Sequence, residues 1–158
     1  MRKHKGFSLI ELLIVVAIIL IIAAIAIPNL LRSRIAANQA SAVGSLRTLN
    51  TAEITYSSTY NSGFSATLSY LQPTTAATPA STAAGLIDSV LASGSKSGYS
   101  FTYSSAATDS AGRIDNYSIT AVPINTSTGT NYYFTDQSGV IRQNSTTTAG
   151  STDSPIAG

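Results

Sequence analysis

Hydrophobic residues are concentrated at the N-terminus of this chain. Phe7–Ile27 reads FSLIELLIVVAIILIIAAIAI, in which Ser8 and Glu11 are the two interruptions, and residues 12–27 are entirely apolar. Twenty-one residues in an α-helix span about 32 Å, which matches the roughly 30 Å hydrocarbon core of a bilayer. The pattern therefore predicts a membrane-spanning helix or a signal sequence.

A helical pattern continues beyond this run. Pro28 lacks a backbone N–H and clashes with the preceding turn, so we expect a helix kink there. Residues 29–60 contain no further proline, and the positions predicted to face inward recur at spacings of three and four. These positions are Ala42, Leu46, Leu49, Glu53, Tyr56 and Tyr60. We expect one helix over about 8–60, bent near Pro28, whose second half packs on a small sheet.

The C-terminal half of the chain alternates with a period of two, which is typical of strands with one buried face. The predicted strands are 99–105, 114–122, 131–135 and 140–143. Their alternating apolar residues are Tyr99, Phe101, Tyr103, Tyr117, Ile119, Ala121, Tyr132 and Phe134. Short turn-forming segments between the strands allow antiparallel hairpins, and Pro123 ends a strand or marks an edge. The predicted fold class is therefore α+β.

Two further segments are irregular by composition. Residues 61–97 are rich in turn-forming residues and predict a surface loop, although 85–92 (GLIDSVLA) has the spacing for two helical turns. In such turns, four apolar side chains are expected to face inward: Leu86, Ile87, Val90 and Leu91. Residues 145–158 are mostly Ser, Thr, Gly and Pro, so we expect an exposed and loosely ordered tail.

Charge is unevenly distributed. The sequence has nine Lys plus Arg, seven Asp plus Glu and an isoelectric point near 9.0, but Arg2, Lys3 and Lys5 precede residue 7. From residue 7 onward, six basic and seven acidic side chains leave a net charge of −1. A nucleic-acid interface needs basic side chains grouped on one face. We therefore expect no nucleic acid as the primary ligand.

Residues suited to catalysis are sparse. The chain has no cysteine, and its one histidine, His4, lies in the basic N-terminal peptide. These facts exclude a disulfide, a thiolate nucleophile and a histidine base inside a folded domain. For an anchored enzyme, a Ser–Lys pair through Lys96 remains formally possible, but one lysine in a Gly/Ser loop gives it little support. We expect no enzyme activity, no catalytic residue and no cofactor.

Metal and glycan sites also have weak signals. The acidic residues after position 88 are Asp109, Asp115, Asp136 and Asp153. None of them lies in a D-x-[DN]-x-[DN]-G run, so we predict no metal ligands, and DQSG at 136–139 predicts a hairpin turn. Triplets of the N-x-[ST] type begin at Asn116, Asn125 and Asn144. Such triplets arise by chance in a Ser/Thr-rich chain.

Three interpretations of the N-terminus compete. A secretory signal peptide fits the basic start and a small-x-small site at 24–26, but the apolar run exceeds the usual 7–15 residues. Glu11 is also costly inside such a run. A plain membrane anchor is the second interpretation, and Arg32 and Arg34 beyond the run weaken any charge bias that sets its orientation.

The third interpretation accounts for more residues. Lys5–Glu11 (KGFSLIE) is a basic leader ending in Gly, followed by an aromatic residue and by a glutamate four positions later. Over residues 2–35 the chain resembles the class III signal of type IV pilins and of type II secretion pseudopilins. The resemblance implies that a prepilin peptidase cuts between Gly6 and Phe7 and N-methylates Phe7. Pro28 matches the helix-kinking proline of that family, whereas Leu20 departs from a glycine that many members have.

The resemblance also implies an architecture and a function. It implies a lollipop-shaped subunit, polymerised through its N-terminal helices by an inner-membrane platform with a cytoplasmic ATPase. The implied parts are a leader (1–6), a transmembrane and filament-core helix (7–31), a globular domain (32–144) and the tail (145–158). Within the globular domain they are the helix continuation (32–60), a variable loop (61–97) and the sheet (98–143).

The filament itself is the main expected product. We expect an inner-membrane precursor with a cytoplasmic N-terminus, then a surface pilus for adhesion, motility or DNA uptake. Glu11 is expected to neutralise the Phe7 amine of a neighbouring subunit, because an unpaired carboxylate in the membrane is costly. The alternative is a pseudopilin, which forms a short periplasmic filament that drives protein export.

Overall fold

The computed structural model describes residues 6–156, and the chain divides between Arg34 and Ile35 into two compact units. Helix α1 (Leu9–Tyr60) contributes to both units, so the helix expected over about 8–60 is confirmed. Pro28 lies inside α1 and does not end it. A proline inside a helix costs about 3 kcal/mol, because it removes a backbone hydrogen bond and clashes with the preceding turn. The helical turns on both sides of Pro28 are formed despite this cost. The kink at Pro28 stays a prediction.

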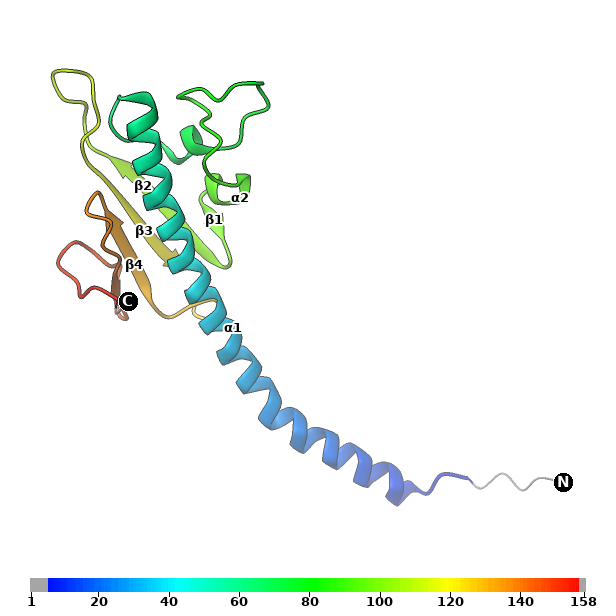
Figure 1. The fold of residues 1–158 in the computed structure, drawn as a ribbon. Helices are drawn as coiled ribbons and strands as arrows, with labels where there is room; N and C mark the ends of the chain where they lie inside the picture. Colours follow the sequence, from blue (N-terminus) through cyan, green and yellow to red (C-terminus); the bar gives the residue numbers. More distant parts are fainter. Residues whose placement is uncertain (1–5, 157–158) are drawn as a thin grey trace. The chain divides into compact units, whose positions relative to one another are not determined.

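The second unit combines the C-terminal half of α1 with one sheet (Figure 1). Its strands are β1 (Ser95–Lys96), β2 (Tyr99–Ser105), β3 (Tyr117–Pro123), β4 (Tyr132–Asp136) and β5 (Arg142–Asn144). They are ordered β1-β2-β3-β4-β5, and every neighbouring pair is antiparallel. The predicted α+β class is confirmed. Strand β1 was missed, because two residues cannot display an alternation.

The core lies between α1 and one face of the sheet. The inward positions expected on the helix are buried at Ala42, Leu46, Leu49, Glu53 and Tyr56, and Tyr60 is half-buried. From the sheet, the buried side chains are Tyr99, Phe101, Tyr117, Ile119, Ala121 and Tyr133. Fully burying a leucine contributes about 1.5–3 kcal/mol to folding. This packing holds the second half of α1 against the strands.

The alternation expected in β4 has the opposite phase. Tyr133 and Thr135 face the core, whereas Tyr132 and Phe134 are half-buried on the other face. The pairing explains this, since Tyr133 lies opposite Ala121 and Thr135 opposite Ile119, which are inward residues of β3. Three aromatic residues in succession give no preferred phase, so the neighbouring strand sets it.

The segment between helix and sheet holds two short helices, η1 (Leu68–Leu71) and α2 (Ser89–Ala92). The predicted two turns over 85–92 are reduced to one, because Asp88 caps α2 by accepting a hydrogen bond from the backbone N–H of Leu91. Val90, expected to face inward, is 54% exposed. The inward prediction holds for Ile87 and Leu91, which are buried.

The segment after β5 is more closely attached than expected. Ala149 is 3% exposed, and Arg142 forms an isolated bridge with Pro155. The backbone N–H of Ile156 donates to the carbonyl of Ile141 over 2.9 Å. The expectation of an exposed tail is therefore wrong at Ala149 and at the residues that contact β5. The Ser/Thr-rich composition of this segment does not indicate these contacts.

Candidate functional site

The described residues just before α1 are exposed. Residues 6–8 have no regular secondary structure, and Phe7 is 78% exposed. A Cβ placed on Gly6 meets no atom within 4 Å. The predicted cleavage position at Gly6 and Phe7 is thus sterically accessible. The basic residues Arg2, Lys3 and Lys5 lie outside the described residues.

Glu11 closes the N-terminal turn of α1. Its Oε2 accepts a hydrogen bond from the backbone N–H of Ser8 over 2.8 Å. Ser8 directly precedes the first helical residue, so Glu11 occupies the third helical position. A carboxylate there accepts a hydrogen bond from a backbone N–H that has no partner within the helix, and it interacts favourably with the positive end of the helix dipole. This capping role was not predicted, although S-x-x-E at 8–11 is the pattern of a capping box.

The apolar side chains that follow are unburied within the chain. Every Leu, Ile and Val between Leu9 and Leu31 is at least 45% exposed. Helix α1 is the one helix in the described part of the chain that is long and apolar enough to cross a membrane. A helix that is apolar on all sides needs lipid or protein around it. This stretch therefore requires a partner that the single chain does not supply.

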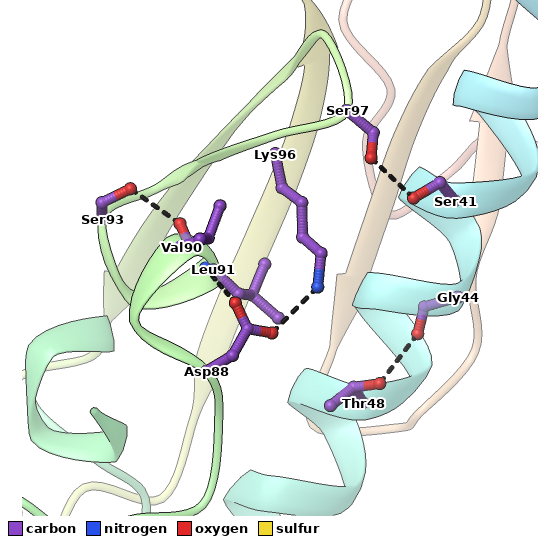
Figure 2. Close-up of polar contacts among 9 residues, drawn as sticks. All are labelled: Ser41, Gly44, Thr48, Asp88, Val90, Leu91, Ser93, Lys96 and Ser97. Atoms are coloured by element: carbon purple, nitrogen blue, oxygen red, sulfur yellow. Dashed lines mark hydrogen bonds and ion pairs between the residues drawn. The ribbon is translucent and has the colours of Figure 1, made fainter. Parts of the chain in front are cut away.

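Lys96, which was considered for a Ser–Lys pair, forms an ion pair with a residue close to it in the sequence. Lys96 Nζ lies 2.8 Å from Asp88 Oδ2, and Ser41 Oγ donates to Ser97 Oγ over 2.9 Å (Figure 2). The hydrogen bond from Lys96 lowers the pKa of Asp88, helped by the backbone N–H of Leu91. Lys96 therefore pairs with a carboxylate, and the structure brings it to no serine nucleophile among residues 6–156.

Three of the four acidic side chains after position 88 also form local hydrogen bonds. Asp109 accepts from the backbone N–H groups of Ala111 and Arg113, and Asp136 accepts from that of Ser138 in the predicted hairpin turn. Asp153 accepts from the side chain of Asn144. No group of three or more His, Cys, Asp or Glu residues suited to a metal occurs between residues 6 and 156.

Two of the N-x-[ST] triplets are turn structures. Asn125 Oδ1 accepts hydrogen bonds from the backbone and side chain of Ser127. Asn144 Oδ1 likewise accepts from the backbone N–H groups of Thr146 and Thr147. Asn side chains commonly form such turns, and this role explains both residues without a glycan.

The inward face of α1 carries a buried carboxylate. Glu53 is fully buried on the inward face of α1, and it accepts hydrogen bonds from the backbone N–H and the hydroxyl of Ser65 over 2.9 and 2.6 Å. Desolvation by burial raises the pKa of Glu53. Desolvation raises the pKa of Tyr103 and Tyr117 too, with the charge of Glu53 as a smaller cause. Glu53 was expected to face inward, but its partner was not predictable.

Comparisons with known proteins point to the N-terminal segment. Residues 1–27 match the family model described as the prokaryotic N-terminal methylation motif. The chain is 68% identical over 38 residues to the type IV wide pilus major component PilA4 of Thermus thermophilus. It is 51% identical over 51 residues to the type IV major pilin protein PilA of Myxococcus xanthus.

These matches cover a limited part of each protein. They include 24% and 32% of this chain, and the chain spans 29% and 23% of the length of the two relatives. No solved structure matches. The N-terminal segment of this chain therefore carries the prokaryotic N-terminal methylation motif and is similar to that of type IV pilins.

Proposed function

We propose that this chain is the precursor of a structural subunit of a type IV pilus. The observation that carries the proposal is an N-terminal methylation motif at the start of an apolar helix whose side chains are unburied within the chain. The names of the two relatives, a pilus major component and a major pilin, support it. We propose no catalytic role for any residue.

Maturation follows from the motif. A prepilin peptidase cleaves between Gly6 and Phe7 and methylates the new amine of Phe7. The exposed, irregular backbone of residues 6–8 supports this step, because a peptidase needs an accessible scissile bond. Methylation keeps the positive charge of the amine while adding one carbon.

Assembly follows from the exposed apolar helix. Before assembly, residues 7–31 lie in the inner membrane with the N-terminus on the cytoplasmic side. A platform with a cytoplasmic ATPase then transfers each subunit into a homopolymer, where neighbouring helices bury the apolar surface that lipid covered before. Glu11 neutralises the Phe7 amine of a neighbour, which removes the cost of two unpaired charges in an apolar core.

The filament is proposed to be an extracellular pilus that serves adhesion, motility or DNA uptake. The alternative is a periplasmic pseudopilus of a type II secretion system. The named relatives favour the pilus, since both are pilus subunits.

Intact mass and N-terminal peptide mapping test this proposal. Filaments sheared from cells are expected to contain a chain that begins at N-methylated Phe7. The same species confined to membranes favours the pseudopilin. A chain that begins near Ile27 or still at Met1 contradicts filament assembly in either form.

Substitutions at Glu11 test the assembly step. Glu11→Gln keeps a side chain that can cap Ser8 but removes the charge, whereas Glu11→Ala removes both. If charge pairing drives assembly, both variants insert into the membrane at wild-type levels and yield few or no sheared filaments. If only the helix cap matters, Glu11→Gln assembles normally and charge pairing is rejected. Immunoblots of membrane and sheared fractions measure both quantities.

A further inference from the structure

Four aromatic side chains from three segments of the second unit line one cavity. Tyr56 and Tyr60 come from the last turns of α1, Phe64 from the loop that follows and Tyr70 from η1. The cavity has a volume of about 340 Å³ and lies beside the C-terminal end of α1, which contributes Tyr56 and Tyr60. Its wall is completed by Ser62, Ala66, Ser81, Gly112 and Ile114. This volume lies at the lower end of the range for small-molecule pockets, about 300–1,000 Å³.

The ring positions are fixed within the fold. The hydroxyl of Tyr56 donates to the carbonyl of Ser81 over 2.8 Å, and the centroids of the Tyr56 and Tyr60 rings are 4.9 Å apart. The ring of Phe64 meets that of Tyr117 edge-on, with centroids 4.7 Å apart. These contacts hold the rings of Tyr56, Tyr60 and Phe64 in place within the fold, and a rigid lining lowers the entropy cost of binding.

The backbone also holds the cavity wall. Gly63 forms a parallel bridge with Ile114, and the N–H of Phe64 donates to the carbonyl of Ile114 over 2.7 Å. A Cβ on Gly63 comes within 2.2 Å of that carbonyl oxygen, so only glycine permits this approach. The loop that carries Phe64 is thereby tied to the residues before β3.

The lining combines ring faces with hydroxyl groups and carries no charge. Tyr60, Phe64 and Tyr70 line the cavity and are half-buried, so each keeps part of its surface open to solvent. The structure gives the hydroxyls of Tyr60 and Tyr70 no hydrogen-bond partner within the described chain. Neither Asp, Glu, Lys nor Arg is among the lining residues. The site therefore offers stacking surfaces and free neutral donors together.

We propose that this cavity binds a neutral saccharide. The C–H groups of a pyranose ring pack against the electron-rich faces of aromatic rings, and its hydroxyls pair with phenol and serine hydroxyls. A purely apolar ligand leaves those hydroxyls without partners, and a charged ligand loses its hydration with no counter-charge. The proposal is independent of filament formation, because none of its residues lies in residues 7–31.

Saturation-transfer NMR on the full-length chain in detergent micelles tests the proposal. The probes are the methyl glycosides of glucose, galactose and mannose, with N-acetylneuraminic acid as a charged comparison. We expect at least one neutral glycoside to bind with a Kd of about 1 mM, as befits its size. Binding of none of the three neutral probes, or equal binding of the acid, overturns the proposal.

Substitutions place the binding in the cavity. Tyr60→Leu and Tyr70→Leu each remove a half-exposed ring and are expected to weaken binding about three- to tenfold, the loss typical of one aromatic contact. Tyr132→Leu removes a half-buried tyrosine that does not line the cavity and serves as the matched control. Near-UV circular dichroism confirms that each variant is folded. If all three variants bind the sugar as tightly as the unmodified chain does, the sugar binds elsewhere and the assignment to this cavity is wrong.

Discussion

At the scale of single residues, several polar groups buried in the core pair with one another. Glu53 accepts two hydrogen bonds from Ser65, and Asn50 donates to the hydroxyl of Thr135 over 2.9 Å. The hydroxyl of Tyr117 donates to Asn50 over 3.1 Å. These bonds join α1 to β3, β4 and the loop after the helix. A buried polar group costs free energy when unpaired, so each pair also selects this arrangement over alternatives.

We predict that Glu53→Gln destabilises the second unit by about 1–3 kcal/mol at pH 4.5, because the amide cannot accept both hydrogen bonds from Ser65. This deficit is expected to shrink as the pH rises. Burial raises the pKa of Glu53 above 4.5, so the folded state holds its proton more tightly than the unfolded state. The protonated Glu53 side chain therefore stabilises the folded state fully below the pKa of Glu53 in the unfolded chain. This stabilisation is lost as the pH rises through the pKa of Glu53 in the folded chain.

Urea unfolding of the full-length protein in detergent, followed by circular dichroism from pH 4 to pH 8, measures this deficit. Asp115→Asn is the control, since the Asp115 side chain is 53% exposed and lies 3.6 Å from Arg113 in a surface ion pair. A deficit for Glu53→Gln that is constant or grows with pH contradicts the role given to the buried carboxylate.

At the scale of elements, one loop glycine permits a close approach between two segments outside the sheet. Gly63 and Gly85 both have positive φ, at 79° and 70°. A Cβ on Gly63 collides with the backbone of Ile114, whereas one on Gly85 meets nothing within 4 Å. The two positions therefore separate the cost of the backbone conformation from the cost of a steric collision.

Gly85→Ala is expected to cost about 1–2 kcal/mol, the price of a left-handed conformation for a residue with a Cβ. Gly63→Ala is expected to cost more, because the bridge to Ile114 must also open. Thermal unfolding of both variants compares the two costs. Similar melting temperatures for the two variants show that the bridge contributes little to stability.

The elements also separate what local pattern predicts from what it leaves open. Strand β2 has the predicted bounds, since Tyr99 and Phe101 alternate with small polar residues. Strand β3 begins at Tyr117 and not at 114, because Ile114 pairs with Gly63 outside the sheet. That pairing joins residues far apart in the sequence, so no local sequence pattern predicts it.

At the scale of the whole molecule, the buried core and the apolar segment occupy separate parts of the sequence. The buried core residues begin at Ala42, whereas the exposed apolar run lies within residues 7–31. The core of the second unit is thus built from other side chains than those of the exposed apolar run. The chain divides at Arg34 accordingly.

We predict that a chain beginning at Ile35 stays folded and monomeric in buffer without detergent. It keeps every residue of the buried core and loses the surface that requires lipid or protein around it. Size-exclusion chromatography with light scattering gives its mass, and near-UV circular dichroism compares its aromatic packing with that of the full chain. Aggregation or loss of the aromatic signal shows instead that residues 7–34 support the fold.

The long helix, its apolar first half and the motif at residues 5–11 can all be predicted from the sequence alone. These features are local, because the period of a helix, the length of an apolar run and the spacing of a motif are all written along the chain. The sequence also indicated the strand positions and the inward stripe of α1.

Other features depend on neighbours that are distant in the sequence and become visible only in the folded chain. The phase of β4 follows from its register with β3, the partner of Glu53 lies twelve residues away in a loop, and the aromatic cavity joins three segments. In each case a residue has several locally acceptable positions. Pairing across the sheet and burial against α1 select one of them, because only that position satisfies the backbone and the core together.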